Sequence, residues 1–474
     1  MKPSVLIVED DVEFIDELRR IFAKLPRPSM LAVASSHSAA VAALDRDFYD
    51  LILLDLKIPT VDGALDADSR HGHAVFAHAR SMTPGTPIFV LTGSPAEDFI
   101  RPMLRQTNQV DIWGEGVPLE TIQFLRKLNV DEFPKQIGPM ISAIDGLNDI
   151  EIIGTTATFG PEEKRLVSIF AKKFRGVSVR VSPLGGGLSA AKVARLYVTD
   201  SQGARVCDVA AKLGSPETIR SEGDRYNRMV VRLDPGATPR NLGELYFGGG
   251  KQSGIFYGLA EGFSFSAFDA ACSGEVPPGQ AVKALEAATA NWRRDIAQTR
   301  RPIHQVRRRM LTDEWHRRIL EEFSIPWAVD FEAREIRTLW ACIHGDLHGA
   351  NALLSKDGRA VLIDYGDVGD GTVSLDPNTL ELSLLFHPDG PDMGDWPSLD
   401  QAKHWGSPDA YLQGCPAEEF VRECRRWAND VAAGPREIAA SAYSYLIRQL
   451  KYDETNKELA LALLDGVKTF FDAR

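Results

Sequence analysis

Three short apolar runs near the start of the chain each end in polar side chains, and this pattern constrains the fold more than any other feature. The runs are residues 5–8 before Glu9 and Asp10, residues 51–54 before Asp55, and residues 88–91 before Thr92. Continuous apolar runs of this length, separated by helical spacing, are typical of strands buried on both faces of a parallel sheet. Because ligands collect beyond the carboxyl ends of such strands, we expect these four polar residues to share one site.

The chemistry of this expected site favours a metal ion. Clustered carboxylates raise one another's pKa unless a cation neutralises them, and hard oxygen ligands suit Mg²⁺. An aspartate beside bound Mg²⁺ can attack a phosphoryl donor. A single strand-end aspartate is more often a solvated surface residue, but four polar groups in register favour a functional site.

These residues make the segment 1–145 resemble the receiver domain of two-component response regulators. The resemblance implies a doubly wound, flavodoxin-like α/β fold. It assigns Asp55 as the phosphoacceptor, Glu9, Asp10 and Asp55 as metal ligands, and Thr92 as the switch hydroxyl. The family also has Pro four residues after the acceptor, and Pro59 follows Asp55 in this way. A cognate histidine kinase or another phosphodonor is the implied partner.

Two insertions distinguish this chain from the receiver pattern. Between Pro59 and Gly72 lies TVDGALDADSRH, which is longer than the usual loop and is placed where it could cover the acidic pocket. Residues 109–120 precede the expected fifth strand, which displaces the lysine that the family places at its end. Our candidate is Lys127, and Lys57 is a weaker alternative.

A change of composition marks the end of the first domain. The helical spacing that ends near Ile144 gives way to residues 146–160, which are rich in Gly, Thr and Asp and are interpreted as a linker. Helical spacing then resumes at residue 161, where we expect a second domain.

A glycine-rich turn and a lysine follow in the second domain. The turn lies between predicted strands and offers Gly185, Gly186, Gly187 and Ser189 to nucleotide phosphates. Glycine-rich hairpins are usually only turns. Lys212 ends a predicted strand and Glu222 begins a helix, so this lysine can bind phosphates while the glutamate fixes its side chain. A surface lysine and a surface glutamate are the simpler alternative.

Two segments further on carry the strongest chemical signal. They are IHGDLHGAN at residues 343–351 and AVLIDYGD at residues 360–367. Asp346 can accept the proton of an attacking hydroxyl, while Asn351 and Asp364 can ligate Mg²⁺. His344 and His348 lie four apart on this loop and could be imagined as metal ligands, but in the family that these segments resemble such histidines are more often structural, so zinc is not expected.

Residues 180–385 resemble the aminoglycoside phosphotransferase and choline kinase branch of the protein-kinase-like fold. The signature is HGDxHxxN followed by an Ile-Asp-aromatic strand end. The resemblance implies a bilobal α+β domain with an N-lobe at 161–258 and a helical C-lobe at 259–474. It also implies ATP and Mg²⁺ as cofactors, Asp346, Lys212 and Glu222 as catalytic residues, and a hinge near residues 254–263.

Charge and composition exclude several classes. The 54 basic and 66 acidic residues give a net charge of -12, which disfavours nucleic acid or an anionic membrane as a partner. Five scattered cysteines without a CxxC pair indicate neither a disulfide framework nor a cysteine zinc site. No apolar run approaches the ~18 residues that span a bilayer, so we expect a cytoplasmic protein.

Residues 282–320 are expected to form one or two helices that carry many arginines. These are Arg293, Arg294, Arg300, Arg301, Arg307, Arg308 and Arg309. They could bind a phosphorylated or acidic substrate or dock on the receiver, but a solvated helical face is the simpler interpretation. Two tryptophans beyond them, Trp405 and Trp427, could line a substrate pocket, although core packing is the more common role.

The combined hypothesis is a response regulator whose output is an ATP-dependent phosphotransferase, controlled by phosphorylation of Asp55. The acceptor would be a hydroxyl of a small molecule or of a protein, and a homodimer is left open. The alternative is a nucleotide-binding pseudokinase that serves as a scaffold in a signalling or defence complex. Antibiotic modification is less favoured, because a resistance enzyme gains little from a phosphorelay switch.

Overall fold

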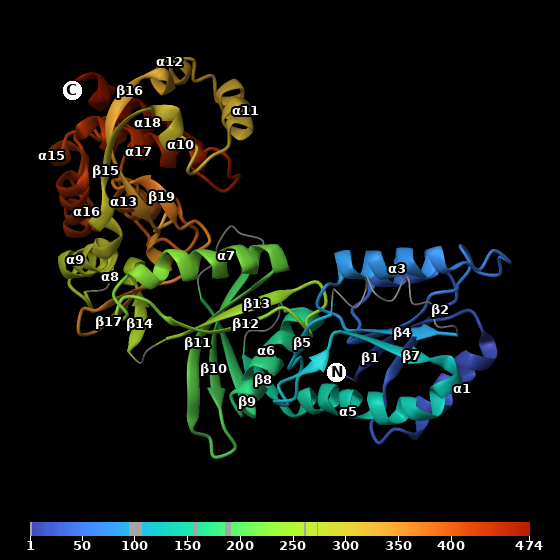
Figure 1. Cartoon of the computed structure of the whole chain (residues 1–474). Coiled ribbons are helices and arrows are strands. Elements are labelled where there is room, and N and C mark those ends of the chain that lie inside the picture. Colours follow the sequence, from blue (N-terminus) through green and yellow to red (C-terminus); the bar gives the residue numbers. More distant parts are fainter. Residues whose placement is uncertain (1, 94–106, 155–158, 185–190, 260–261, 273) are drawn as a thin grey trace. The chain divides into compact units, whose positions relative to one another are not determined.

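The chain, shown as a computed structural model in Figure 1, forms two compact units. Unit 1 comprises Met1–Arg220 and Asn241–Gly258, and unit 2 comprises Ser221–Arg240 and Leu259–Arg474. The structure describes residues 2–93, 107–154, 159–184, 191–259, 262–272 and 274–474. Within these ranges, no helix has both the length and the apolar character needed to cross a membrane.

The first sheet of unit 1 has five parallel strands in the order β2-β1-β3-β4-β7 (Figure 1). They are β1 (Ser4–Val8), β2 (Met30–Ala34), β3 (Leu51–Asp55), β4 (Ile88–Thr92) and β7 (Ile122–Arg126). Every residue of β3 and β4 is buried, as their continuous apolar composition predicts.

Helices cover both faces of this sheet. They are α1 (Val12–Lys24), α2 (His37–Arg46), α3 (Ser69–Met82) and α5 (Phe133–Asp145). The buried side chains of α1 and α5 join one hydrophobic cluster, and those of α2 and α3 join another. The doubly wound receiver fold that was predicted for the first domain is therefore confirmed.

The insertion at residues 109–120 folds into a small hairpin. Its strands β5 (Gln109–Val110) and β6 (Leu119–Glu120) pair antiparallel. Ile112 and Trp113 lie between them, and each side chain is only 1% exposed. The insertion is therefore anchored in a core, and the short 3-10 helix η1 (Lys127–Glu132) follows it after β7.

The second sheet of unit 1 has six strands in the order β12-β13-β11-β10-β9-β8. They are β8 (Glu151–Gly154), β9 (Ser178–Pro183), β10 (Lys192–Thr199), β11 (Arg205–Gly214), β12 (Arg240–Leu245) and β13 (Ser253–Gly258). Strand β8 pairs parallel with β9 at the edge. The segment 146–160, interpreted as a linker, thus contains the 3-10 helix η2 (Gly146–Asp149) and a sheet strand.

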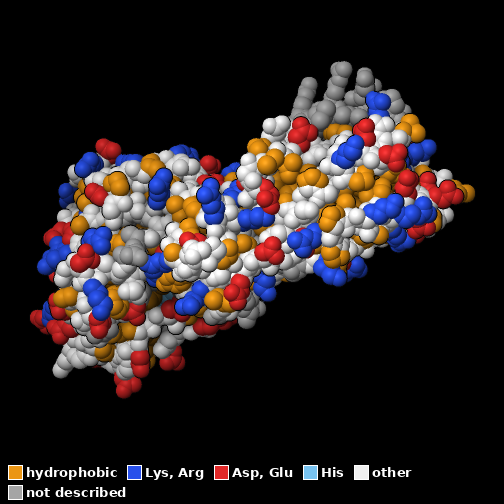
Figure 2. Space-filling view, turned by 90° about the horizontal axis from the view of Figure 1, so that it is seen from below, with side chains coloured by type: hydrophobic (Ala, Val, Ile, Leu, Met, Phe, Trp, Pro, Cys, Tyr) orange, Lys and Arg blue, Asp and Glu red, His pale blue; other side chains and the backbone are white. Residues whose placement is uncertain are grey.

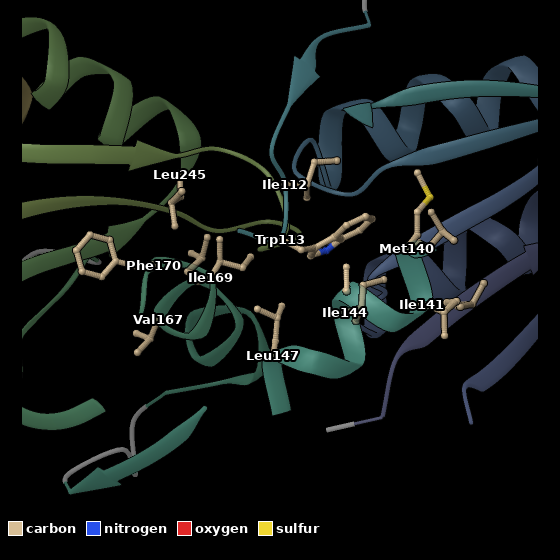
Figure 3. Close-up of a cluster of buried hydrophobic side chains, with 14 of the residues drawn as sticks. Ile112, Trp113, Met140, Ile141, Ile144, Leu147, Val167, Ile169, Phe170 and Leu245 are labelled. Carbon is tan, nitrogen blue, oxygen red and sulfur yellow. The ribbon is translucent and has the colours of Figure 1, made fainter. Parts of the chain in front are cut away.

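One hydrophobic cluster runs through both halves of unit 1 (Figure 3). It contains Trp113 from the insertion, Ile144 from α5, and Ile169 and Phe170 from α6 (Pro161–Lys173). Phe170 in turn stacks on Phe256 of β13, with ring centroids 4.1 Å apart and nearly parallel planes. The receiver-type sheet and the six-stranded sheet are consequently packed through α6.

Polar contacts reinforce the same junction. Arg165 of α6 forms an ion pair with Asp50 at 2.8 Å, and both side chains are almost fully buried. The Gly85 N–H donates to the Gly250 carbonyl at 3.0 Å, while the Gly248 N–H donates to the Gly85 carbonyl at 2.8 Å. Because buried polar groups need partners, these bonds specify one packing arrangement.

Unit 2 combines two small sheets, ordered β14-β17-β18 and β15-β16-β19, with helices. The strands are β14 (Phe263–Ser266), β15 (Ala297–Pro302), β16 (Glu335–Ile343), β17 (Ala352–Ser355), β18 (Ala360–Leu362) and β19 (Gly369–Thr372). This mixed α/β composition agrees with the predicted α+β class.

The helices that follow the two sheets of unit 1 or lie between their later strands complete the fold. They are α7 (Pro216–Arg228), α8 (Ala267–Cys272), α9 (Pro278–Thr289), α10 (Ile303–Arg307), α11 (Asp313–Phe323), α12 (Trp327–Ala333), α13 (Leu375–Phe386), α14 (Leu399–Lys403), α15 (Pro408–Tyr411), α16 (Glu418–Val431), α17 (Pro435–Gln449) and α18 (Lys457–Asp472). Short 3-10 turns are η3 (Val230–Arg232), η4 (Ala290–Asp295) and η5 (Gly349–Asn351).

The prediction of one or two helices across residues 282–320 is wrong. Strand β15 interrupts the segment between η4 and α10 and pairs antiparallel with β16. The sequence AQTRRP contains few apolar residues, so neither helical nor strand periodicity is visible in it. The pairing with β16 decides its conformation, which is a tertiary effect.

Candidate functional site

An acidic pocket lies at the carboxyl ends of the first sheet. Glu9 directly follows β1 and Asp55 ends β3, so the parallel register brings them together. Carboxylate oxygens of Glu9, Asp10 and Asp55 lie within 4.8 Å of one another. Thr92, at the end of β4, is 7% exposed and lines the same cavity of 630 Å³. All four strand-end residues singled out from the sequence therefore share one site.

The lysine of this pocket is Lys127. Its Nζ atom lies 2.6 Å from Glu9 Oε2 and 3.0 Å from Asp55 Oδ2. Lys127 occupies this place because it is the first residue after β7, despite the preceding insertion. Lys57, the weaker alternative, is an exposed residue of the pocket lining.

The inserted loop after Pro59 contributes to the pocket rim. Ala67 and Ser69 line the cavity beside the acidic residues. The loop is held by the Thr60 N–H, which donates to Asp66 Oδ1 at 3.1 Å, and by a backbone bridge between Ile58 and Asp68. It thus borders the pocket, as its position in the sequence suggested.

The electrostatics of the pocket favour a bound cation. Burial and the neighbouring Asp55 carboxylate together raise the pKa of Glu9 to about 7, against the opposing effect of Lys127. Burial also raises the pKa of Asp55, again opposed by Lys127. Four carboxylates and two ammonium groups line the pocket, so negative charge is in excess. Hard oxygen donors at this spacing fit Mg²⁺.

The predicted nucleotide-binding residues fall partly in the described chain. Lys212 is buried in β11, opposite Ile255 of β13, and Glu222 is buried in α7. Gly185, Gly186, Gly187 and Ser189 lie outside the described residues. The predicted hinge, residues 254–263, contains the end of β13 and the start of β14.

A tightly held loop in unit 2 carries Asp346. Asp376 of α13 accepts hydrogen bonds from the backbone N–H groups of His344, at 2.8 Å, and Gly345, at 2.9 Å. Gly345 adopts φ +83°, and a Cβ there would lie 2.5 Å from the Asp367 carbonyl oxygen, so only glycine fits. The turn before Asp346 is therefore fixed by backbone contacts.

The same contacts place Asn351 and Asp364 on one platform. Asn351 Nδ2 donates to the Asp346 carbonyl at 2.9 Å, and the Ile363 N–H donates to the Asn351 carbonyl at 3.0 Å. Asp364 follows in a left-handed conformation, φ +61°, which is uncommon for a residue with a side chain. The structure thus brings together the three residues singled out in this segment.

The contact that sequence reasoning missed is an ion pair between Asp346 and Arg448 of α17. Arg448 Nη1 donates to Asp346 Oδ1 at 2.8 Å, and both side chains are largely buried. Burial acts to raise the pKa of Asp346, but Arg448 outweighs it and holds the pKa well below its usual range. Arg448 lies 102 residues from Asp346 in the chain, and no local sequence motif indicates that the two residues pair.

Three histidines lie on or beside the loop that carries Asp346, and among the described residues none of them belongs to a cluster that could hold a metal ion. The His348 and His387 rings are 4.2 Å apart, and burial lowers the pKa of His348 to about 4. The other histidine of the motif, His344, has its Nε2 3.1 Å from the Ile363 carbonyl. This pattern agrees with the expected structural role.

Most of the arginines at positions 293–309 have structural partners. Arg307 forms a buried ion pair with Glu332 at 2.9 Å, and Arg308 pairs with Asp313 at 2.8 Å. Arg309 donates to the Asp367 carbonyl at 2.8 Å. The interpretation of the whole segment as a solvated helical face is wrong, because these arginines bind other elements.

The two C-terminal tryptophans are core residues. Trp405 is 3% exposed and Trp427 is 1% exposed. Trp405 Nε1 donates to Glu381 Oε1 at 3.3 Å, and the Arg425 guanidinium lies 5.0 Å from its ring centroid. Packing in the core therefore accounts for the positions of both tryptophans.

Comparisons with known proteins agree with the first part of this description. The family model of the response regulator receiver domain matches residues 5–108, so this segment is a receiver domain. One similar solved structure is the phosphorylated cyanobacterial phytochrome response regulator RcpA, at 21% identity, covering 30% of this chain and 91% of that chain, with a TM-score of 0.23.

Two further structures extend the comparison. The receiver domain of the sensor histidine kinase PA1611 from Pseudomonas aeruginosa PAO1, with a magnesium ion in its active-site cleft, is 16% identical, covers 29% of this chain and 97% of that chain, and has a TM-score of 0.20. The aminoglycoside phosphotransferase APH(4)-Ia is 14% identical, covers 62% of this chain and 93% of that chain, and has a TM-score of 0.34. Among curated proteins, none matches this chain.

Proposed function

We propose that the protein is a receiver-controlled, ATP-dependent phosphotransferase that acts on a hydroxyl group. The observation that carries this proposal is the platform of unit 2, where the loop bearing Asp346 and Asn351 is hydrogen-bonded to the strand end that bears Asp364. A base and two oxygen ligands on one rigid loop are what phosphoryl transfer requires.

In the proposed reaction Asp346 accepts the proton of the acceptor hydroxyl. The acceptor oxygen then forms a bond to the γ-phosphorus of ATP, while the bond from that phosphorus to the β–γ bridging oxygen breaks and ADP leaves with the electron pair. Asn351 and Asp364 would hold Mg²⁺, which neutralises phosphate charge when bound. Lys212 would bind the nucleotide phosphates, and Glu222 would fix its side chain.

The receiver would supply the control. Glu9, Asp10 and Asp55 would hold Mg²⁺, whose charge favours attack of the Asp55 carboxylate on a phosphodonor. Lys127, already 3.0 Å from Asp55 Oδ2, would neutralise the new phosphoryl group, and the Thr92 hydroxyl would bond to it. A histidine kinase or a small phosphodonor is the proposed partner, in the cytoplasm.

The shared core of unit 1 supports transmission of this signal to the second sheet. Ile112 and Trp113 pack with α6, and α6 packs on β13. A conformational change in the receiver would therefore reach the second sheet through directly packed side chains. Packed cores respond to such changes by moving between discrete arrangements.

The test of the chemistry is Mg²⁺-dependent consumption of ATP by the full chain. We expect Asp346→Asn to lower the rate at least about a hundredfold, because a general base contributes roughly that much. Asp330→Asn, which alters an exposed residue of α12, is the matched control. Equal rates in the Asp346 variant and the wild type would contradict the proposed role.

A second candidate function is a nucleotide-binding scaffold. The Arg448 ion pair favours it, because a carboxylate whose pKa is held low is a weak base. A scaffold that binds nucleotide would show a higher melting temperature with Mg·ATP but no ATP consumption, whereas the enzyme would show both.

A further inference from the structure

A pocket lined by arginines lies in unit 2, on the strands that lead to the catalytic loop. Its volume is 390 Å³, within the range of small-molecule sites. The basic side chains of its lining are Arg300, Arg337, Arg436 and Arg474. Arg337 is six residues before the end of β16 at Ile343, so roughly 20 Å of strand separates the pocket from the catalytic loop.

Two of these arginines face each other by strand pairing. Arg300 of β15 is the direct partner of Arg337 of β16, and both are exposed. Like charges at directly opposed positions destabilise a strand pair unless a counter-charge lies between them. Within the described chain, no ion pair joins any of the four pocket arginines to a carboxylate, although nearby arginines such as Arg307, Arg334 and Arg425 have such partners.

The acidic residues of the pocket do not neutralise it. Glu437 is buried, accepts hydrogen bonds from the N–H groups of Leu339 and Ala433 at 2.9 and 2.8 Å, and has its pKa raised by that burial. Glu335 is the other carboxylate. Four guanidinium groups therefore face two carboxylates, one of which is occupied by backbone donors.

The N-terminus of α17 adds to the positive potential. Ala433, Gly434 and Pro435 line the pocket, and no side chain caps the helix at Gly434. The positive end of a helix dipole attracts anions, and guanidinium forks bind phosphate oxygens in a bidentate manner.

The four arginines of this pocket stand out against the net negative charge of the chain. The chain carries -12 overall, and on the face shown in Figure 2 acidic and basic side chains are interspersed. A pocket with four arginines departs from that pattern. We propose that this pocket binds a small ligand that carries phosphate groups, at a site separate from the receiver pocket and from the catalytic loop.

The probe is pyrophosphate, titrated into the full chain by isothermal calorimetry with EDTA present, so that sites that need a metal do not contribute. We expect Arg300→Gln/Arg337→Gln to weaken binding at least tenfold, whereas Arg317→Gln/Arg318→Gln on α11 removes the same charge from another exposed surface and leaves binding unchanged. The wild type should also still bind pyrophosphate when sodium chloride keeps the ionic strength of both solutions in the titration equal.

Melting without pyrophosphate gives a second readout that does not depend on the titration. Removing the repulsion between opposed arginines should leave the melting temperature of the Arg300/Arg337 variant equal to or above that of the wild type, which also shows that the variant folds. Absence of pyrophosphate binding to the wild type, or equal binding to both variants, would overturn the proposal.

Discussion

Arg448 shows how one residue sets the chemistry of another across the fold. The Asp346 carboxylate is buried and would be costly to ionise alone, but the guanidinium 2.8 Å away keeps it charged. In the proposed reaction, the ion pair would keep Asp346 as a carboxylate while weakening it as a base. Substrate or phosphate that draws Arg448 away would strengthen the base, which couples proton transfer to binding.

Arg448→Met should destabilise the protein by about 3–5 kcal/mol at pH 7, because it leaves a buried carboxylate unpaired. The wild-type Asp346 pKa is depressed, so the stabilisation is present above the unfolded pKa and is lost as pH falls through the folded value. Down to pH 4 the wild type keeps most of this stabilisation, whereas the unpaired carboxylate of the variant, whose pKa burial would raise, takes up a proton, so the difference between the two should shrink towards pH 4. Urea unfolding at pH 7 and pH 4 measures this, with the exposed Arg318→Met as control. An equal difference at both pH values would contradict the ion-pair account.

The clustered carboxylates of the receiver pocket are expected to bind Mg²⁺. Without nucleotide, Mg²⁺ in about tenfold excess over its dissociation constant should raise the melting temperature by roughly 2–5 °C. Asp10→Asn should abolish most of this shift, because it removes one of the three clustered carboxylates. Asp16→Asn, on the exposed surface of α1, should keep it. A shift that survives in the Asp10 variant would place the metal elsewhere.

Among the secondary-structure elements, strands marked by apolar runs could be predicted from the sequence. Elements whose conformation depends on pairing with a distant segment could not. Strands β1, β3 and β4 and the strand-end acids follow from apolar runs, and Lys127 follows from its place after β7. Strand β15 was missed because its conformation depends on β16. The partnership of Asp346 with Arg448 depends on the packing of α17 against the loop, which no local sequence pattern reveals.

The hairpin at residues 109–120 is one of the elements that join the receiver to α6. Trp113→Ala should lower the unfolding free energy by about 3–5 kcal/mol, because it leaves a cavity in the shared core. Trp315→Ala removes a tryptophan that is 38% exposed and should cost much less. Chemical denaturation of both variants measures the difference. A loss at Trp113 no larger than that at Trp315 would show that the hairpin is not an anchor.

At the scale of the whole molecule, the receiver and the six-stranded sheet behave as one packed body. In the described part of unit 1, the cluster through Trp113, Ile144 and Phe170 and the buried pair of Arg165 with Asp50 join the two sheets by direct packing. A receiver joined in this way can act through packing, whereas a tethered receiver acts mainly through association. This packing supports the proposal that the state of Asp55 controls phosphotransfer by the second domain.

The most direct test is the rate of ATP consumption by the full chain with and without beryllofluoride, which mimics a phosphoryl group on Asp55. We predict a change of about fivefold or more, equivalent to a coupling free energy of about 1 kcal/mol. The change should be absent in Asp55→Asn, which cannot bind the mimic in the same way. Equal rates with and without beryllofluoride in the wild type would contradict receiver control.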